Sequence, residues 1–332
     1  MKVYENISLK PYNTFGIDVK ARRMVVVEPE DKVPDLDGEV LVIGAGSNMV
    51  FTKDFEGTVI IAGARSTVSD ADVVSQSKGG TPCPICVTAW AGMVMDDLIQ
   101  WTLDHGLYGL ENLSAIPGTV GASAVQNVGA YGAEAKDFIE SVEAYDMVGK
   151  RHCIFSNDDC QFAYRDSFFK HHPNRYLILR VTYRLSHEFV PNLGYKALEG
   201  LPHDTAQQLR EAITEIRWQK LPRPEEHGSA GSFFKNPVVD EKVYRHIKSE
   251  HPDMPEAHLS VGGYKLSAGW LIDRAGWKGK TKGRAGVWPK NALVLYNAGG
   301  CTGEDVAALA KEIQQDVKQK FGVDLEPEAL II

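Results

Sequence analysis

Two residues of the chain, Arg165 and Ser232, are candidates for chemistry because each stands among small and aromatic residues. Arg165 stands between Tyr164 and a Ser-Phe-Phe run, and its guanidinium is suited to gripping a carboxylate or phosphate with paired hydrogen bonds. Ser232 follows Gly231 in the run GSAGSFFKNP. Together the segments predict an anion held by Arg165 and a hydroxyl presented to a ligand, although either segment alone also fits a surface loop.

Two carboxylates near the end of the chain are further candidates. Glu326 and Glu328 alternate with Leu330 and Ile332, so a terminal strand would place all four side chains on one face. A carboxylate on an apolar face is either a functional acid or part of a frayed terminus. The period of two does not decide between them.

The first glycine loop begins as a dinucleotide-binding fingerprint does, with an apolar run leading into Gly44 and Gly46. It lacks the third glycine, the following helix and the downstream acid that such a site requires. The loop therefore predicts a tight turn whose backbone N–H groups, with the side chains of Ser47 and Asn48, cradle an anion. An ordinary glycine turn is the alternative.

The second glycine loop is residues 106–132, which contain six glycines, one proline and almost no charge. Its Leu, Ile, Val and Tyr residues exclude a solvated linker, and its glycines and proline argue against a regular element. Backbone that approaches a large planar or phosphorylated ligand would explain the glycines together with Asn127 and Tyr131. The alternative is a glycine-rich crossing between two domains.

The elements that must position these groups form an α+β pattern. Strands are predicted in six apolar runs: 22–29, 39–44, 57–63, 84–90, 141–147 and 176–185. Helices are predicted before Gly106, from an N-cap at Asp204 to the LPRP hinge at 221–224, from Asp240, and from a Thr302–Asp305 capping box to Gly322. A final strand is predicted over 323–332.

Composition excludes several classes of protein. A chain of 332 residues suggests two or three domains, and a net charge of −8 without a basic block disfavours nucleic-acid and anionic-membrane surfaces. No apolar run is long enough to span a bilayer, and the amino terminus lacks a secretory signal, which predicts a cytoplasmic protein. Cys83 and Cys86 lack a second ligand pair, so they are interpreted as buried thiols and no metal is predicted.

Seven motifs in order resemble the UDP-N-acetylenolpyruvoylglucosamine reductase family of flavoenzymes over nearly the whole chain. They are NTFG at 13–16, GAGSN at 44–48, the second glycine loop, YRDS at 164–167, GSAGSFFKNP at 228–237, KLSAGWLID at 265–273 and LEPE at 325–328. The resemblance implies a two-lobed FAD-binding unit of the vanillyl-alcohol-oxidase (PCMH) type, followed by an α/β substrate-binding domain. The implied domains are FAD lobe 1 at 1–65 joined by 323–332, FAD lobe 2 at 66–203, and the substrate domain at 204–322.

The resemblance also implies the reaction and its residues. NADPH would deliver a hydride to non-covalently bound FAD, and the reduced flavin would reduce UDP-N-acetylglucosamine enolpyruvate to UDP-N-acetylmuramate. Arg165 and Glu328 would stabilise negative charge beside the substrate carboxylate, and Ser232 would donate the proton. The implied FAD contacts are Gly44, Ala45, Gly46, Ser47, Asn48, Pro117, Gly118, Gly121, Tyr131 and Gly132. The implied substrate contacts are Tyr195 on the loop 185–202, Lys220, Asn236 and Asn291; as a residue near a helix end, Lys220 also fits a solvated C-terminal cap.

Two departures from the family pattern concern geometry more than reaction class. Glu328 leads into Ala-Leu-Ile-Ile instead of Val-Arg, and Trp288 stands where some relatives carry a histidine. Two other functions remain open: an FAD oxidase that shares the flavin lobes, and a nucleotide-binding module without turnover. No obligate protein partner is indicated.

Overall fold

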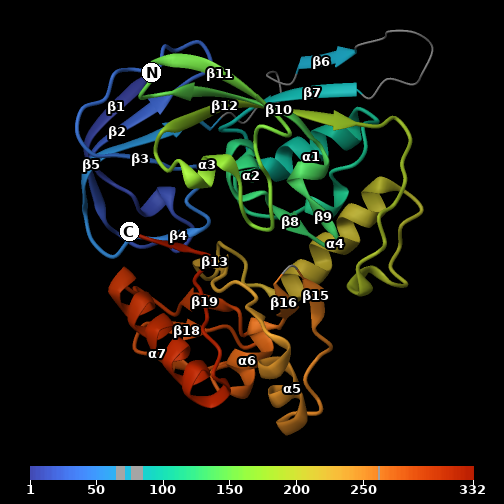
Figure 1. Cartoon of the computed structure of the whole chain (residues 1–332). Helices are drawn as coiled ribbons and strands as arrows, with labels where there is room; N and C mark the ends of the chain where they lie inside the picture. The colour runs from blue at the N-terminus through green and yellow to red at the C-terminus, as the bar shows by residue number, and fades with distance from the viewer. Residues whose placement is uncertain (65–71, 76–84, 261) are drawn as a thin grey trace. The chain divides into compact units, whose positions relative to one another are not determined.

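The computed structural model describes residues 1–64, 72–75, 85–260 and 262–332 and divides into two compact units (Figure 1). Unit 1 consists of Met1–Ile7, Ala21–Ala45 and Glu56–Arg217. Unit 2 consists of Ser8–Lys20, Gly46–Phe55 and Trp218–Ile332. The first glycine loop and the helix before the LPRP segment each cross from one unit to the other. The three domain ranges given above stay a prediction.

The two larger sheets in the described part of unit 1 share a core. The first has the order β1-β2-β5-β3, with β1 Lys2–Ser8, β2 Lys20–Val27, β5 Phe55–Ala62 and β3 Val40–Val42. The second has the order β11-β10-β12-β7-β6, with β11 Arg151–Ser156, β10 Ile139–Asp146, β12 Tyr176–Leu185, β7 Ile85–Trp90 and β6 Asp72–Ser75. Val27 and Ile60 of the first sheet pack in one cluster with Trp90 and Leu179 of the second.

Helices of unit 1 pack beside the second sheet (Figure 1). They are α1 Met95–Asp104, α2 Val120–Gln126 and α3 Phe168–His171. The helix α4 Ala206–Lys220 packs instead with Leu198 through Leu209 and Ile213, and its last three residues belong to unit 2. Leu98 of α1 and Val120 of α2 are fully buried. The Tyr183 hydroxyl of β12 lies 2.8 Å from Ser123 Oγ of α2, so the buried tyrosine has a polar partner. The short strands β8 Gly129–Ala130 and β9 Ala133–Glu134 close the second glycine loop.

Unit 2 is built on three small sheets and three helices. The sheets are β13-β19-β18-β17, with β13 Ser229–Ser232, β19 Val294–Asn297, β18 Ala285–Val287 and β17 Thr281–Lys282; β14-β16-β15, with β14 Val238–Val239, β16 Gly263–Lys265 and β15 His258–Ser260; and the pair β20 Leu330–Ile331 and β4 Met49–Val50. The helices are α5 Glu241–Glu250, α6 Ala268–Arg274 and α7 Gly303–Phe321.

Elements with local signals agree with the sequence predictions. The six predicted strands are present as β2, β3, β5, β7, β10 and β12. Asp240 caps α5 by accepting a hydrogen bond from the Val243 N–H, and Thr302 and Asp305 form the expected capping box of α7. Gly322 ends α7 with φ at 69°, in the left-handed region that glycine adopts most easily.

Three local predictions were wrong. Thr205, and not Asp204, supplies the cap of α4, because its Oγ1 accepts a hydrogen bond from the Gln208 N–H. The second glycine loop includes a regular helix, α2. The terminal strand forms only at Leu330–Ile331, where the chain pairs in parallel with β4.

Candidate active site

In unit 2, the NTFG motif ties the first glycine loop to β13. Asn13 is 5% exposed, and its side chain binds the backbone of Leu9 and Ile17 on both sides of the motif. The Thr14 N–H donates to the Gly46 carbonyl at 3.2 Å, and Thr14 Oγ1 donates to the Ser229 carbonyl at 2.6 Å. The motif therefore holds the start of β13 next to the turn at Gly46.

The first glycine loop has the backbone donors that an anion cradle requires. Gly46 has φ at 61°, and a Cβ there would lie 2.1 Å from the Tyr12 carbonyl oxygen. The N–H groups of Gly44, Ala45 and Gly46 donate no hydrogen bond to any residue that the structure describes. Consecutive bare N–H groups suit a pyrophosphate, so the loop fits the phosphate portion of FAD. The chain then enters β4 and β5, not a helix, which confirms that this is not a Rossmann turn.

Ser232 and Glu328 are brought together on neighbouring segments of unit 2. The segment before β20 pairs with the one after β13: the Glu328 N–H donates to the Phe233 carbonyl at 2.8 Å, and the Lys235 N–H donates to the Glu326 carbonyl at 2.9 Å. Asn48 of the first glycine loop donates its side-chain amide to the Glu328 carbonyl at 3.1 Å. Three segments distant in sequence thus converge beside Ser232.

The backbone presents Ser232 outward. The pairing of β13 with β19 shifts register between Ser229 and Ser232, and Gly231 in that interval has φ at 66°. Such a bulge bends the strand and redirects the next side chain. Ser232 is exposed, and its hydroxyl forms no hydrogen bond with another residue that the structure describes. It is therefore available to a ligand.

The two terminal glutamates differ, and the predicted shared apolar face was wrong. Glu326 is exposed and forms an ion pair with Lys235 at 2.5 Å, whereas Glu328 is half-buried. The chain bends at Glu328, and Leu330 beyond the bend is 53% exposed. Backbone pairing with Phe233 holds Glu328, so it is not a frayed end.

In unit 1, Arg165 is fixed against the second glycine loop. Its guanidinium donates to the Gly129 carbonyl at 2.6 Å and to the Asn127 carbonyl at 3.5 Å, and it lies over the Tyr164 ring. Asn127 does not face a ligand as predicted. It is fully buried, its amide nitrogen donates to Glu134 Oε2 and the Ala163 carbonyl, and its Oδ1 accepts from the Lys136 N–H. Asn127 therefore holds the turn that carries Arg165.

Tyr195 and Tyr131 also meet in unit 1. Their rings are in edge contact with centroids 5.6 Å apart, and Tyr195 is 49% exposed. Asn112 joins the two loops that carry them by donating to the carbonyls of Tyr131 and Asn192 at 2.8 and 2.9 Å. A Cβ at Gly132 would lie 3.7 Å from the Tyr195 Cβ, so the tyrosine loop packs directly on the second glycine loop.

Arg217 is the residue of this region that the sequence analysis missed. Its side chain interacts with the Tyr131 hydroxyl, and its Nε donates to the Ala115 carbonyl at 3.0 Å. Burial lowers the pKa of the Arg217 guanidinium, and the charge of Arg165 lowers it further. The signal was present: Arg217 continues the spacing of Leu209 and Ile213 and so places a cation on the apolar stripe of α4.

The remaining predicted positions have mixed surroundings. Gly121 packs in the core, because a Cβ there would lie 2.9 Å from that of Ala91, and the Gly118 carbonyl accepts the first N–H of α1. Lys220 is exposed at the end of α4. Asn236 and Asn291 use Oδ1 to accept backbone hydrogen bonds from Ala268 and Leu293.

Within the described part of the chain, no group of acidic, histidine or cysteine side chains could hold a metal ion. Cys86 is half-buried, and Cys83 lies outside the described residues. None of the described helices is long and apolar enough to cross a membrane.

Comparisons with known proteins bear on the family and the fold of the chain. The model of the UDP-N-acetylenolpyruvoylglucosamine reductase C-terminal domain matches residues 223–332, and that of an FAD binding domain matches residues 34–153. The chain is 45% identical to the UDP-N-acetylenolpyruvoylglucosamine reductase of Pseudomonas aeruginosa, across 99% of this chain and 98% of the relative. It is 42% identical to that of Bacteroides fragilis, across 99% of both. The crystal structure of the Thermus caldophilus reductase (MurB) superimposes with a TM-score of 0.69 at 24% identity, covering 100% of this chain and 99% of that one. The predicted α+β fold, an FAD-binding unit followed by a substrate-binding domain, is confirmed.

Proposed function

The chain belongs to the UDP-N-acetylenolpyruvoylglucosamine reductase family, and from this premise we propose how its residues divide the work of that reaction. The protein is an FAD-dependent oxidoreductase of peptidoglycan precursor synthesis, which uses NADPH to reduce UDP-N-acetylglucosamine enolpyruvate to UDP-N-acetylmuramate. Bound FAD supplies the hydride chemistry between the two substrates. The observation that carries the assignment of residues is the convergence of Asn48, Glu328 and Ser232 in unit 2.

The first glycine loop holds the pyrophosphate of FAD through the N–H groups of Gly44, Ala45 and Gly46. A negatively charged ligand stabilises a set of N–H groups that have no partner within the described residues. Asn48 links this loop to Glu328 and so couples the position of the cofactor to that of the terminal segment. Pro117, Gly118 and the other predicted positions of the second glycine loop form a further FAD contact in this proposal.

Arg165 acts on the substrate carboxylate. Negative charge builds at the carbon next to that carboxylate when the hydride adds, and a fixed cation there stabilises the transition state more than the ground state. Hydrogen bonds to the carbonyls of Gly129 and Asn127 hold the guanidinium in place before the substrate arrives. Glu328 has its backbone fixed by Phe233 and assists at the same stage of the reaction.

Ser232 donates the proton that completes the reduction. A serine hydroxyl is a weak acid in water, so it acts only when it is positioned against the developing carbanion, where a general acid contributes about 10²–10⁴-fold. The bulge at Gly231 and the exposed, unpartnered hydroxyl within the described chain suit this role. Tyr195, Lys220, Asn236 and Asn291 bind the UDP-sugar in this proposal.

We propose that the reaction takes place in the cytoplasm. Among the described residues, Cys153, Cys160 and Cys301 are free thiols, which is typical of a reducing compartment.

Stopped-flow flavin absorbance tests the role of Ser232 in one preparation. NADPH should bleach the flavin of Ser232→Ala at the parent rate, because that step needs no proton at the substrate carbon. Reoxidation by the enolpyruvate substrate should slow by about 10²–10⁴-fold, and Ser232→Cys should recover part of it. Ser229→Ala on the same strand is the matched control and should match the parent in both steps.

Equal slowing of both steps would mean that Ser232 shapes the site without donating a proton. Two simpler measurements address the alternatives. An oxidase with tethered flavin would keep its FAD on denaturation, whereas the reductase should release it. A binding module without turnover would show no NADPH consumption that depends on the UDP-sugar.

A further inference from the structure

A bidentate ion pair joins the beginning of α1 to the middle of α4. Arg210 donates from Nη1 and Nη2 to the two carboxylate oxygens of Asp96 at 2.8 and 2.9 Å, and from Nε to Gln100 Oε1 at 2.8 Å. The Arg210 side chain is only 13% exposed. Arg210 therefore has its planar fork fully engaged between two helices, an arrangement that lysine cannot reproduce.

The same carboxylate holds a backbone group in an unfavourable conformation. Asp96 Oδ1 accepts a hydrogen bond from the Ala115 N–H at 2.6 Å, and Ala115 is 6% exposed with φ at 57°. A left-handed conformation costs a residue with a side chain about 1–2 kcal/mol, so it persists only where neighbours impose it. Ala115 immediately precedes Ile116 and Pro117 of the second glycine loop.

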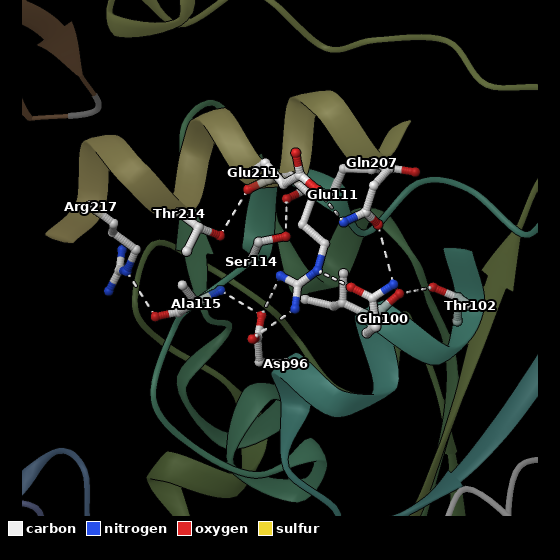
Figure 2. Close-up of polar contacts among 12 residues, drawn as sticks. Asp96, Gln100, Thr102, Glu111, Ser114, Ala115, Gln207, Glu211, Thr214 and Arg217 are labelled. Atoms are coloured by element: carbon white, nitrogen blue, oxygen red, sulfur yellow. Dashed lines mark hydrogen bonds and ion pairs between the residues drawn. The ribbon is translucent and has the colours of Figure 1, made fainter. Parts of the chain in front are cut away.

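Ala115 in turn binds Arg217, as Figure 2 shows: the Ala115 N–H points to Asp96 and its carbonyl points to Arg217. The Arg217 side chain then interacts with the Tyr131 hydroxyl, and Tyr131 contacts Tyr195. Asp96 and Arg217 are thus linked through one residue, because the N–H and the carbonyl of Ala115 each form one of the two hydrogen bonds. Arg217 and Arg165 are like charges that destabilise each other. An anion bound by both would remove that repulsion.

We propose that Asp96 and Arg210 are positioning residues that fix Ala115 and thereby set the Arg217 guanidinium beside Tyr131, where it binds the anionic part of the UDP-sugar substrate. This inference rests on the proposed function, because the anion is the substrate's carboxylate or diphosphate. Asp96 and Arg210 do not touch the substrate. Their effect appears in substrate binding and not in the reduction of the flavin by NADPH.

Exchanging the two charges distinguishes two possible roles of the Asp96–Arg210 pair: holding Ala115 in position, or only joining α1 to α4. The double variant Asp96→Arg with Arg210→Asp restores an ion pair between α1 and α4, but a guanidinium has no acceptor for the Ala115 N–H. We expect the KM for UDP-N-acetylglucosamine enolpyruvate to rise about tenfold or more, with the rate of flavin reduction by NADPH, measured on the FAD-loaded protein, unchanged. The matched control exchanges Glu241 and Arg245, an exposed pair on α5, and should leave KM at the parent value.

A second pair of variants tests the same contact if the exchange does not fold. Asp96→Asn and Asp96→Leu both remove the charge that pairs with Arg210, but only asparagine keeps an oxygen for the Ala115 N–H. The leucine variant should have the higher KM, by about tenfold. Competition by UDP identifies the anion that Arg217 binds. An inhibition constant for UDP that is higher in the variant than in the parent assigns Arg217 to the diphosphate, and an unchanged constant assigns it to the carboxylate.

A parent KM in the charge-exchanged protein, or equal KM values for the asparagine and leucine variants, overturns the inference while leaving the reaction intact. Failure of the parent protein to oxidise NADPH in response to the UDP-sugar refutes the proposed function instead. The two failures can be distinguished, because one is measured on the variants and the other on the parent protein.

Discussion

Gly46→Ala tests whether the first glycine loop is constrained by its close contact with Tyr12. Gly46 has φ at 61° and Gly322 has φ at 69°, so alanine meets a similar backbone penalty of about 1–2 kcal/mol at either position. The surroundings differ. A Cβ at Gly46 would lie 2.1 Å from the Tyr12 carbonyl oxygen, whereas nothing lies within 4 Å of one at Gly322. The backbone at Gly46 must shift, and such overpacking costs about 1–3 kcal/mol more.

Comparing the free energies of unfolding of the two variants in urea measures the additional cost of the contact at Gly46. We expect Gly322→Ala to lose about 1–2 kcal/mol and Gly46→Ala about 2–5 kcal/mol. Because the displaced turn carries the N–H groups assigned to the pyrophosphate, Gly46→Ala should also lose FAD on gel filtration, while Gly322→Ala should retain it. Equal destabilisation of the two variants, each with a full complement of flavin, would refute the contact and the cradle together.

Two further predictions concern titratable groups in unit 1. Hydrogen bonds from Arg175 lower the pKa of Asp146 from 3.8 to about 2, so this carboxylate stabilises the fold above pH 4 and the contribution fades as the pH falls towards 2. Asp146→Asn should cost about 2 kcal/mol at pH 7 and progressively less below pH 4 in urea titrations; a penalty independent of pH would contradict the ionic origin. Burial raises the pKa of the Cys160 thiol to about 12, so iodoacetamide at pH 8 should modify Cys153 and spare Cys160 in the native protein, as mass spectrometry of tryptic peptides would show.

Helix α7 was predictable because its signals are local. The capping box of Thr302 and Asp305 and the left-handed Gly322 each act within a few residues of sequence. The prediction of a terminal strand over 323–332 was wrong because alternating burial does not by itself imply continuous strand pairing. Val323 and Leu325 are buried in alternation, yet the chain beyond them pairs through single bonds with Phe233 and Lys235 and not as one continuous strand.

Helix α2 was missed because the glycines and the proline of the second glycine loop argued against a regular element. Gly121 approaches Ala91 so closely that a larger side chain would collide, and its N–H donates to the Ala91 carbonyl. The residue type that weakens the helix in isolation is thus required by its packing. The prediction that Asn127 faces a ligand was wrong for a related reason. A polar side chain in an apolar loop can form hydrogen bonds with buried backbone groups instead of with a ligand.

Four of the motifs nevertheless lie together in unit 2, namely NTFG, residues 46–48 of the first glycine loop, GSAGSFFKNP and LEPE. The Asp96–Ala115–Arg217 chain was beyond sequence reasoning for a physical reason. Its central member is Ala115, which contributes a conformation and two backbone groups, none of which depends on its side chain. Arg217 on an apolar stripe could have been flagged. Its orientation depends on where the Ala115 carbonyl lies, and only the fold determines that.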